Sequence, residues 1–296
     1  MLTVLGLAAV AVNLFPGDST PTVAAGDLAL PIRAAFYYPW YPEHWTMDKT
    51  HYRPSAGSYS SSDPALIRSH IDAMRYGRIQ AGISSWWGRG SPEDARMPAL
   101  LQAASGTSFK WAINYELQGY GEPSVSDLTS DLLYLQSHYA QDPNYLTIDG
   151  HFVVFVYNRW KEGCDLVDRW QQANTGINAY VVLKIIEHPE GCRQPDAWYD
   201  YDPVKAESST ADSFVIAPGF WRGSRKATCE ASADGDCLRR SPSRWAKNVQ
   251  DMASSRKKFQ LIISFNEWAE GTGVESAREW ASPSGFGVYL DALHDQ

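Results

Sequence analysis

Runs of β-branched and aromatic residues that are apolar almost throughout recur along this chain. "FVVFVY" (residues 152–157) and "YVVLKII" (180–186) have too few polar side chains to leave one strand face in water. Strands of this kind are buried on both faces, as in a parallel sheet that helices cover. Eight such strands are predicted, at residues 33–40, 81–87, 109–116, 151–158, 179–186, 197–201, 213–220 and 259–267.

Helical patterns lie between most of these strands. Residues 63–78 repeat apolar side chains at helical spacing after Asp63 and Pro64, a capping residue followed by a proline that suits the first turn. Further helices are predicted at residues 126–140, 165–173, 241–258 and 287–294. The stretches 187–196 and 222–240 lack this periodicity, and we expect them to be loops.

Strands that alternate with helices along one chain predict an α/β fold, a single (β/α)8 TIM barrel. Such barrels carry their functional site at the carboxyl ends of the strands. The alternative is an open doubly wound sheet, which usually has a glycine-rich phosphate loop after an early strand. Neither GxGxxG nor GxxxxGK[ST] occurs in the sequence, so we expect one barrel domain over residues 29–296.

The first 28 residues read as a leader rather than as part of the barrel. Leu2–Phe15 is apolar, and Val23-Ala24-Ala25 offers small residues for cleavage, as in a secretory signal peptide. The positive amino-terminal region of such a peptide is missing, so a truncated start is the alternative. The apolar run is too short for a stable membrane span. The sequence therefore predicts a secreted, cell-surface or periplasmic protein.

The charge and the aromatic content narrow the classes of ligand. The net charge is -8 and no stretch is strongly basic, which argues against a nucleic-acid partner. The chain has 12 Trp and 16 Tyr, and such rings suit the apolar faces of sugars, although they also fill large cores.

The four cysteines predict disulfides if the protein is exported, whereas free thiols are the alternative in a cytosolic chain. None of them forms a CxxC, and no cluster has the spacing of a metal site. Cys164 and Cys192 follow neighbouring predicted strands, and Cys229 and Cys237 share one loop. We therefore expect the pairs Cys164–Cys192 and Cys229–Cys237.

Aromatic and polar side chains gather where the predicted strands end, and the ends of barrel strands share one face. The candidates for contact with a ligand are Tyr37, Tyr38, Trp40, Trp86, Trp87, Tyr115, Glu116, Tyr157, His188, Asp200, Arg222, Asn266 and Trp268. Each of these residues also has a purely structural interpretation. Trp86 and Trp87 point to opposite sides of a strand, so one of them belongs to the core. A lone histidine is more often structural, and Asp200 is as suited to holding a loop.

"SFNEWAEG" (residues 264–271) ends the last predicted strand with two glutamates three positions apart. Hydrolysis of a glycosidic bond needs one carboxylic acid as proton donor and a second carboxylate as base or nucleophile. Side chains at i and i+3 of a strand point to opposite sides, so Glu267 and Glu270 share a pocket only if the chain turns after Glu267. Gly271 favours such a turn, but the spacing alone equally allows Glu270 to be a solvated loop charge.

The motifs "YYPWY", "NYE", "WYDYDP", "APGF" and "SFNEWAEGTGVE", together with "GSYSSSDPALIRSHIDAMRYGRIQAGISSWWG", resemble glycoside hydrolase family 99. They occur in the order of that family and cover most of the chain after residue 33. The resemblance implies a (β/α)8 catalytic domain with endo-acting, retaining α-mannosidase or α-mannanase activity. It implies a carbohydrate substrate, no cofactor and no metal, and we expect a monomer.

The resemblance also implies roles for the two glutamates. Glu267 matches the base that acts on the sugar's own 2-hydroxyl, which attacks the anomeric carbon to give a 1,2-anhydro sugar. Glu270 matches the acid that protonates the leaving group and then helps water to open the epoxide. Asn266 precedes this pair and is expected to orient it.

The sequence departs from the family pattern at Ala269, where mannan-active members usually have His, and at Gly273-Val274, where they have Gln-Ile. Two alternatives therefore stay open. One is an endo-hydrolase of another α-linked bacterial surface polysaccharide. The other is a non-catalytic barrel that binds a glycan or accompanies polysaccharide synthesis.

Overall fold

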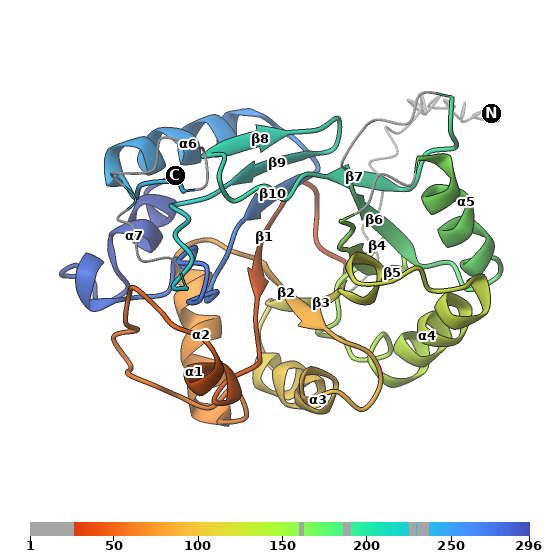
Figure 1. Ribbon diagram of the computed structural model, residues 1–296, viewed down its shortest axis with the longest axis horizontal. Coiled ribbons are helices and arrows are strands. Elements are labelled where there is room, and N and C mark those ends of the chain that lie inside the picture. The colour runs from red at the N-terminus through yellow and green to blue at the C-terminus, as the bar shows by residue number, and fades with distance from the viewer. Residues whose placement is uncertain (1–26, 160–162, 186–190, 225–228, 230–236) are drawn as a thin grey trace, which may run out of the picture.

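Eight parallel strands form the centre of the computed structural model, which describes residues 27–159, 163–185, 191–224, 229 and 237–296 (Figure 1). They are β1 (Ile32–Tyr37), β2 (Ala81–Trp86), β3 (Lys110–Tyr115), β5 (His151–Val156), β6 (Tyr180–Lys184), β7 (Ala197–Tyr199), β9 (Ser213–Ile216) and β10 (Phe259–Ile262). Two short strands pair antiparallel with members of this set, β4 (Thr147–Ile148) with β5 and β8 (Glu207–Ser209) with β9. The predicted α/β barrel is confirmed.

The helices form an outer layer around these strands (Figure 1). They are α1 (Glu43–Met47), α2 (Pro64–Tyr76), α3 (Pro92–Ala104), α4 (Val125–His138), α5 (Cys164–Ala173), α6 (Pro242–Ser254) and α7 (Val288–His294). Asp63, Ser91, Ser124 and Ser241 each accept a backbone N–H at a helix start, which satisfies a donor that the helix leaves unpaired. Five of the seven match predicted helices, and 3-10 turns follow β3 and precede α7.

Helix α3 was not predicted, and its composition explains why. It buries Glu93, Asp94 and Arg96 beside Met97 and Leu100, so no continuous apolar stripe marks its inner face. Pro98 also lies inside the helix, where a proline removes a backbone hydrogen bond. A polar buried face hides a helix from a search for apolar periodicity.

The barrel is closed by backbone pairing everywhere except between β7 and β9. The hydrogen-bonded order is β7-β6-β5-β3-β2-β1-β10-β9-β8. At the gap, which we call the seam, two side chains replace the ladder. Asp212 accepts the Trp198 N–H at 3.0 Å, and the Thr210 hydroxyl donates to the Trp198 carbonyl at 2.8 Å. Buried backbone groups need partners, and here the turn between β8 and β9 supplies them.

Alternation along the strands divides the core into two layers. Ile32, Ala34 and Phe36 of β1 lie in the cluster inside the barrel, whereas Ala35 and Tyr37 belong to the cluster between barrel and helices. Successive strand side chains point to opposite faces, so each strand supplies both layers. The same alternation decides which side chain at each strand end reaches the mouth of the barrel.

Both predicted disulfides are present, between Cys164 and Cys192 and between Cys229 and Cys237, with Cα–Cα distances of 5.1 and 5.7 Å. The Asp27 carboxylate accepts hydrogen bonds from the Thr147 hydroxyl and the Gly150 N–H, and Leu28 packs against the inner core. The predicted leader before Asp27 lies outside the described residues, so the boundary after residue 28 stays a prediction.

Among the described residues, no helix has both the length and the apolar character needed to cross a membrane. In the same part of the chain, no three His, Cys, Asp or Glu side chains are grouped so that they could hold a metal ion.

Candidate active site

The two glutamates of "SFNEWAEG" lie in a tight turn rather than at the end of a strand. Strand β10 stops at Ile262, so the predicted strand over 259–267 is too long by five residues. The chain then folds back: the Ser264 N–H donates to the Thr272 carbonyl at 3.1 Å, and the Thr272 N–H to the Glu267 carbonyl at 3.2 Å. Gly271 completes the reversal with a φ of 64°, a left-handed conformation that glycine adopts without strain. We call residues 264–275 the glutamate turn.

Glu267 is held at the centre of this turn. Its side chain is buried, and Oε1 accepts the N–H groups of Ala269 at 2.8 Å and Glu270 at 3.2 Å. Its own N–H donates to the Ser264 hydroxyl at 2.8 Å. Burial, together with the nearby charge of Glu270, raises the pKa of Glu267 well above its ordinary value, against the opposing effect of the two N–H donors.

Glu270 is more open, with 24% of its side chain exposed, and Oε1 lies 3.0 Å from Arg222 Nη2. The loop after β9 carries Arg222 and pairs with the glutamate turn, because the Trp221 N–H donates to the Glu270 carbonyl at 2.8 Å. Burial raises the pKa of Glu270, whereas Arg222 and Lys184 act to lower it. The turn thus brings Glu267 and Glu270 to one place, as the two-carboxylate interpretation requires.

Glu116 adds a third carboxylate beside this pair. It follows β3, is buried, and accepts hydrogen bonds from the Ser85 hydroxyl at 2.9 Å and the Asn114 amide at 2.8 Å. Burial raises its pKa to about 7, with the two hydrogen bonds opposing the shift and the charge of Glu270 adding to it. A carboxyl with such a pKa can carry a proton near neutral pH and donate a hydrogen bond.

Aromatic rings and a lysine surround the carboxylates from the inward positions of other strands. The Tyr38 and Tyr201 hydroxyls are 2.6 Å apart, and Lys184 Nζ lies 4.7 Å from the centre of the Tyr157 ring. The sequence interpretation missed Lys184 and Tyr201. The alternation of strand side chains could have found them, since both lie an even number of residues beyond an inward-facing core position, Val182 and Tyr199.

Two further aromatic groups extend the site along its rim. Trp87 stacks near Tyr120 with ring centres 4.6 Å apart, and Trp40 lies 4.6 Å from the Tyr38 ring. His44 of α1 stacks on Trp40 at 4.2 Å with nearly parallel planes. Tyr120 and His44 were not predicted, because they lie on connecting segments whose position the strand pattern does not fix.

Four predicted ligand contacts do not face the mouth of the barrel: three of them, Tyr37, Trp86 and Tyr115, alternate to the other side of their strands, and Trp268 lies in the glutamate turn. Tyr37, Trp86, Tyr115 and Trp268 are almost fully buried in the layer between barrel and helices, away from the carboxylates. Their polar atoms form hydrogen bonds within the outer layer. Tyr37 bonds to His70, Trp86 to Asp94, Tyr115 to Asp131, and Trp268 to both Tyr59 and Glu275.

The remaining candidates have mixed positions. Asn266 clamps β1, because its side chain accepts the Tyr38 N–H at 2.7 Å and donates to the Tyr38 carbonyl at 3.1 Å. Asp200 lies 3.8 Å from the Lys205 ammonium, which favours the loop-holding interpretation. His188 lies outside the described residues.

A buried polar network supports the glutamate turn from behind. Glu275 Oε2 accepts from the Tyr59 hydroxyl at 2.8 Å and from Trp268 Nε1 at 3.1 Å. Its Oε1 lies 3.2 Å from His70 Nε2 of α2. Trp268 separates the two glutamates in the sequence, so fixing its indole also restricts the backbone between them.

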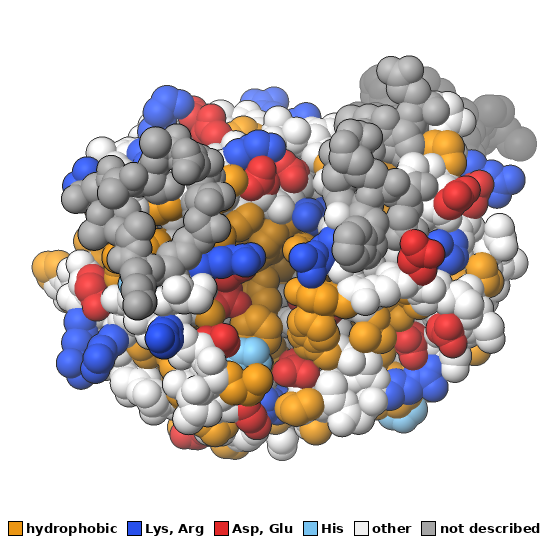
Figure 2. All heavy atoms as spheres, viewed as in Figure 1, with side chains coloured by type: hydrophobic (Ala, Val, Ile, Leu, Met, Phe, Trp, Pro, Cys, Tyr) orange, Lys and Arg blue, Asp and Glu red, His pale blue; other side chains and the backbone are white. Residues whose placement is uncertain are grey.

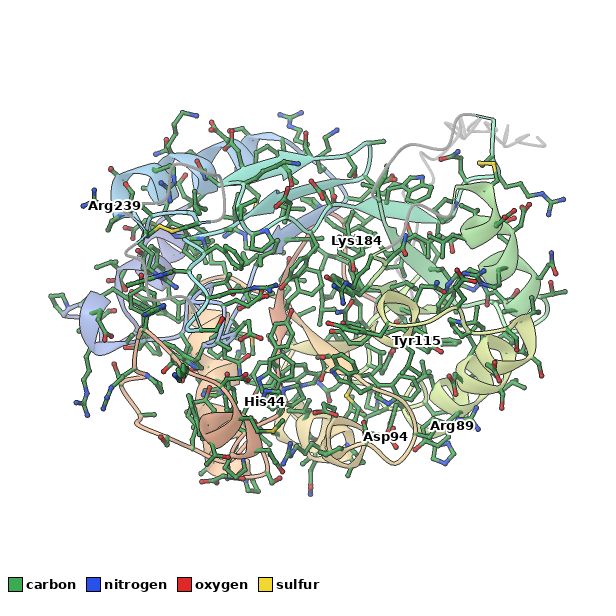
Figure 3. The ribbon with its side chains drawn as sticks, in the orientation of Figure 1. His44, Arg89, Asp94, Tyr115, Lys184 and Arg239 are labelled. Atoms are coloured by element: carbon green, nitrogen blue, oxygen red, sulfur yellow. A yellow bond between two sulfur atoms is a disulfide. The ribbon has the colours of Figure 1, made fainter. Side chains whose placement is uncertain are left out.

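The face of the molecule at these strand ends is hollowed, with acidic, basic and hydrophobic groups gathered in the hollow (Figure 2). Lys184 lies near the middle of the same view, whereas Arg89 and Asp94 lie toward the helices (Figure 3). A side cavity of about 660 Å³ borders Tyr120 and also touches Arg89, Glu122 and Asp131.

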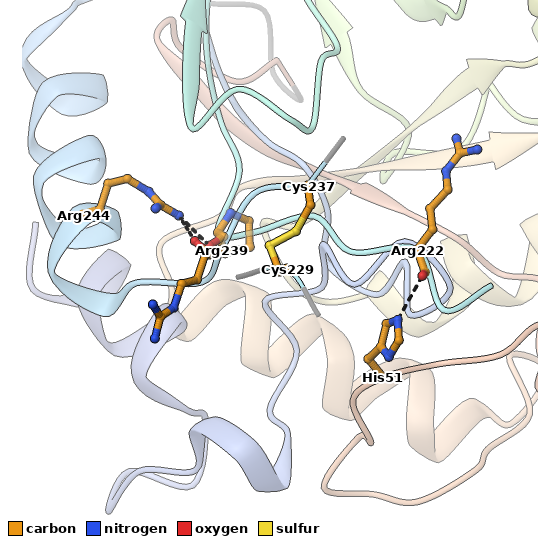
Figure 4. The surroundings of a disulfide bond; sticks show 7 residues. His51, Arg222, Cys229, Cys237, Arg239 and Arg244 are labelled. Carbon is orange, nitrogen blue, oxygen red and sulfur yellow. Dashed lines mark hydrogen bonds between the residues drawn. A yellow bond between two sulfur atoms is a disulfide. The ribbon is translucent and has the colours of Figure 1, made fainter. Parts of the chain in front are cut away.

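The loop after β9 is anchored on both sides of its disulfide (Figure 4). His51 Nε2 lies 2.9 Å from the Arg222 carbonyl, and the His51 ring stacks on Trp221 at 3.4 Å. Beyond Cys237, the Arg244 guanidinium donates to the Arg239 carbonyl. Gly223 has no room for a side chain, because a Cβ there would lie 1.6 Å from the Lys49 carbonyl oxygen. These contacts hold Arg222 in place against Glu270.

In a comparison with known protein families, the model described as "Glycosyl hydrolase family 99" matches residues 46–178. The chain is 25% identical over 261 residues to "Glycoprotein endo-alpha-1,2-mannosidase" of Xenopus laevis, covering 76% of this chain and 58% of that protein. It is 22% identical to "Glycoprotein endo-alpha-1,2-mannosidase-like protein" of Homo sapiens, covering 82% of this chain and 60% of that protein. The chain thus spans less than two thirds of either relative.

Among solved structures, the fold is similar to the GH99 endo-alpha-mannosidase of Bacteroides thetaiotaomicron, with a TM-score of 0.72 and 17% identity. That superposition covers 90% of this chain and 96% of the other. A second structure, titled "Glycoside hydrolase-like protein", gives a TM-score of 0.63 at 16% identity and covers 95% of this chain and 97% of the other. At these identities the likeness is one of fold.

Proposed function

We propose that this chain belongs to glycoside hydrolase family 99 or to a closely related group of family-99-like domains, and that it is a retaining, endo-acting glycoside hydrolase. Its proposed substrate is an α-linked, mannose-type glycan or polysaccharide. Its two disulfides are typical of exported proteins, so we place it outside the cytosol, secreted or at the cell surface.

The observation that carries this proposal is the pairing of Glu267 and Glu270 within one turn at the carboxyl end of the barrel. Burial raises the pKa of both carboxyls, and the charge of Glu270 raises that of Glu267 further. Two interacting carboxyls hold one proton between them over a wide pH range, so one serves as acid while the other serves as base. That is the division of labour that glycoside hydrolysis needs.

In the first proposed step, Glu267 takes the proton of the sugar's 2-hydroxyl. The freed oxygen attacks C1, the bond from C1 to the leaving oxygen breaks, and Glu270 gives that oxygen its proton. In the second step, Glu270 takes a proton from water, the water oxygen bonds to C1, and the C1–O bond of the 1,2-anhydro ring breaks. The 2-oxygen regains its proton from Glu267.

The electrostatics of the turn suit both steps. The raised pKa of Glu267 makes its carboxylate a stronger base toward a hydroxyl group. Burial lets Glu270 hold a proton in the first step, and Arg222 at 3.0 Å stabilises the carboxylate that remains after the proton has been given away. Attack by an axial 2-hydroxyl matches the trans-diaxial geometry of ring opening, which favours mannose-configured sugars.

The surrounding groups support a sugar as the ligand. Tyr38, Tyr157 and Tyr201 present hydroxyls beside ring faces, and Glu116 can accept or donate a hydrogen bond to a sugar hydroxyl. Trp87 and Tyr120 form an aromatic surface at the rim.

The decisive experiment separates the roles of the two glutamates by changing the leaving group. Two α-mannosyl oligosaccharides are compared, one with a dinitrophenyl leaving group and one with a natural sugar. Glu270→Gln should still release dinitrophenolate from the first in an initial burst, because a good leaving group needs no proton, but should turn over slowly afterwards, because water attack still needs Glu270 as base. It should lose activity on the second. Glu267→Gln should lose both. Proton NMR of the first-formed product should show a retained α-anomer.

Glu207→Gln, an exposed change on β8, is the matched control and should behave as the wild type. If folded wild-type protein cleaves no member of a panel of α-linked glycans, the hydrolase proposal is wrong and a binding barrel is favoured. If it cleaves α-glycans other than mannans, the second candidate is favoured, an endo-hydrolase of another surface polysaccharide.

A further inference from the structure

A cavity of about 500 Å³ lies at the end of the barrel where the strands begin, opposite the glutamate turn. The residues that matter in its wall are Arg33, Arg75, Arg78, Gln80, Ser108 and Gln260. Arg33 and Gln260 are the second residues of β1 and β10, and Gln80 directly precedes β2. The cavity is therefore built on the starts of barrel strands and on the loops beside them.

Arg33 is buried, and the hydrogen bonds of its side chain within the described part of the chain go to neutral groups. Nε donates to Gln260 Oε1 at 3.3 Å, and Nη1 donates to the Leu293 carbonyl at 3.3 Å. Burial and the charge of Arg78 both lower its pKa, so the protein holds two like charges close together here. A buried charge is costly unless a counter-charge accompanies it.

The other polar groups of the wall are arranged as donors. Gln80 Oε1 accepts the Arg33 N–H at 2.9 Å, and Gln260 Oε1 accepts Arg33 Nε. These bonds occupy both amide oxygens and leave the amide –NH2 groups as the remaining polar ends of the two side chains. No carboxylate is among the residues that line the cavity, and Asp72 meets Arg75 on the outer surface at 3.6 Å.

We propose that this cavity is a binding site for a multiply charged oxyanion, a phosphate or sulfate group. Guanidinium groups match such anions with paired, charge-assisted hydrogen bonds, and three arginines with no carboxylate among the lining residues favour an anion over a cation. An anion between Arg33 and Arg78 would supply the missing counter-charge. The site is distinct from the proposed hydrolase site, and the group can be a free ion or a substituent on a sugar.

The test is isothermal titration calorimetry of the whole chain with inorganic phosphate, with mannose 6-phosphate and with mannose. We expect one phosphate per chain, with weaker binding as salt rises, because charge carries the interaction. Arg78→Gln should weaken phosphate binding on the order of tenfold, since it removes a charged hydrogen-bond donor from an exposed position. Arg68→Gln, the same change on the exposed side of α2, should not.

Arg33→Gln serves as a second variant, checked for folding by circular dichroism, and should abolish binding if it folds. Binding of mannose 6-phosphate as well as free phosphate supports the site and identifies a phosphorylated sugar as its source. Binding of inorganic phosphate alone supports it with the free ion as ligand. Absence of phosphate binding, or equal weakening by Arg68→Gln and Arg78→Gln, overturns it, whether or not the protein hydrolyses glycans.

Discussion

At one end of the barrel, the charge of Glu270 raises the pKa of Glu116 and of Glu267, and at the other end the charge of Arg78 lowers the pKa of Arg33. The two ends differ in how the energetic cost of a buried charge can be lowered. A carboxylate can take up a proton, and burial drives it to do so. A guanidinium keeps its proton in proteins, so only an anion can relieve it. Acid–base chemistry therefore suits the first end, and binding suits the second.

The largest expected effect is a loss of catalytic rate at the end of the barrel that holds the three glutamates, and it tests whether acid–base chemistry takes place there. Glu267→Gln and Glu270→Gln should each lower kcat on the natural glycan on the order of 10³-fold. Neither should lower the free energy of unfolding, because each removes a buried charge while the amide oxygen still accepts hydrogen bonds. Steady-state kinetics and urea unfolding measure both. A loss of stability that explains the loss of rate would show that the pair is structural.

Glu116 gives the next largest effect, on stability as a function of pH. Its pKa is about 7 in the folded protein against 4.5 for an ordinary glutamate, so the folded state binds the proton more tightly. The stabilisation from this proton is complete below the unfolded pKa and is lost as pH rises through the folded pKa. Between pH 5 and pH 8 the wild type should lose on the order of 3 kcal/mol from this group.

Glu116→Gln mimics the protonated carboxyl and should flatten this pH dependence, as measured by urea unfolding at both pH values. Glu207→Gln is again the control, because its carboxyl is exposed. An unchanged slope in Glu116→Gln would mean that the carboxyl is ionised in the folded protein across the whole range.

The next prediction concerns Thr210, which lies at the same end of the barrel as Arg33, where we expect polar side chains to stabilise the fold. Thr210→Val keeps the shape but leaves the Trp198 carbonyl at the seam without its donor. The free energy of unfolding should fall by about 2 kcal/mol, with kcat unaffected. Thr175→Val, which removes only a local bond on α5, should cost less. If kcat fell as much as stability, the two ends would not be separable.

The smallest effect concerns Arg222, whose guanidinium lies 3.0 Å from Glu270 Oε1. Arg222 favours the ionised carboxylate, so Arg222→Gln should raise the pKa of Glu270. If Glu270 works as an acid, the alkaline limb of the pH–rate profile should move to higher pH. The shift should be less than about one unit, because the guanidinium is largely exposed to water. Arg53→Gln is the exposed control, and a shift to lower pH would reverse the assigned role.

The sequence predicted the barrel well because eight strands carry their own signal in apolar runs. It also predicted both disulfides, since Cys164 and Cys192 follow neighbouring strands and Cys229 and Cys237 share one loop. Helix α3 was missed because its inner face is polar, with Glu93 and Asp94 buried. The seam could not be predicted, because it depends on hydroxyl and carboxyl partners that form only when the ring of strands closes.

The site was predicted less evenly, and the reason is local geometry. Strand ends identified Tyr38, Glu116 and Tyr157, but the same reading included Tyr37, Trp86 and Tyr115, which alternate to the opposite face. Applying the two-residue period to each strand end would have removed these three and added Lys184 and Tyr201. No period governs the glutamate turn, whose shape depends on hydrogen bonds among its own residues.

The seam also affects which insertions this barrel can accept during evolution. Strands joined by a backbone ladder constrain each other's register, so inserting a residue in one displaces its neighbour. Within the described residues, side-chain hydrogen bonds of Thr210 and Asp212 take the place of a backbone ladder between β7 and β9, and the chain between these strands holds β8 and no helix. Insertions there leave the other strand pairs in register. The wall that carries Tyr199 and Tyr201 can therefore vary in length, and with it the glycans admitted, while the glutamate turn stays fixed.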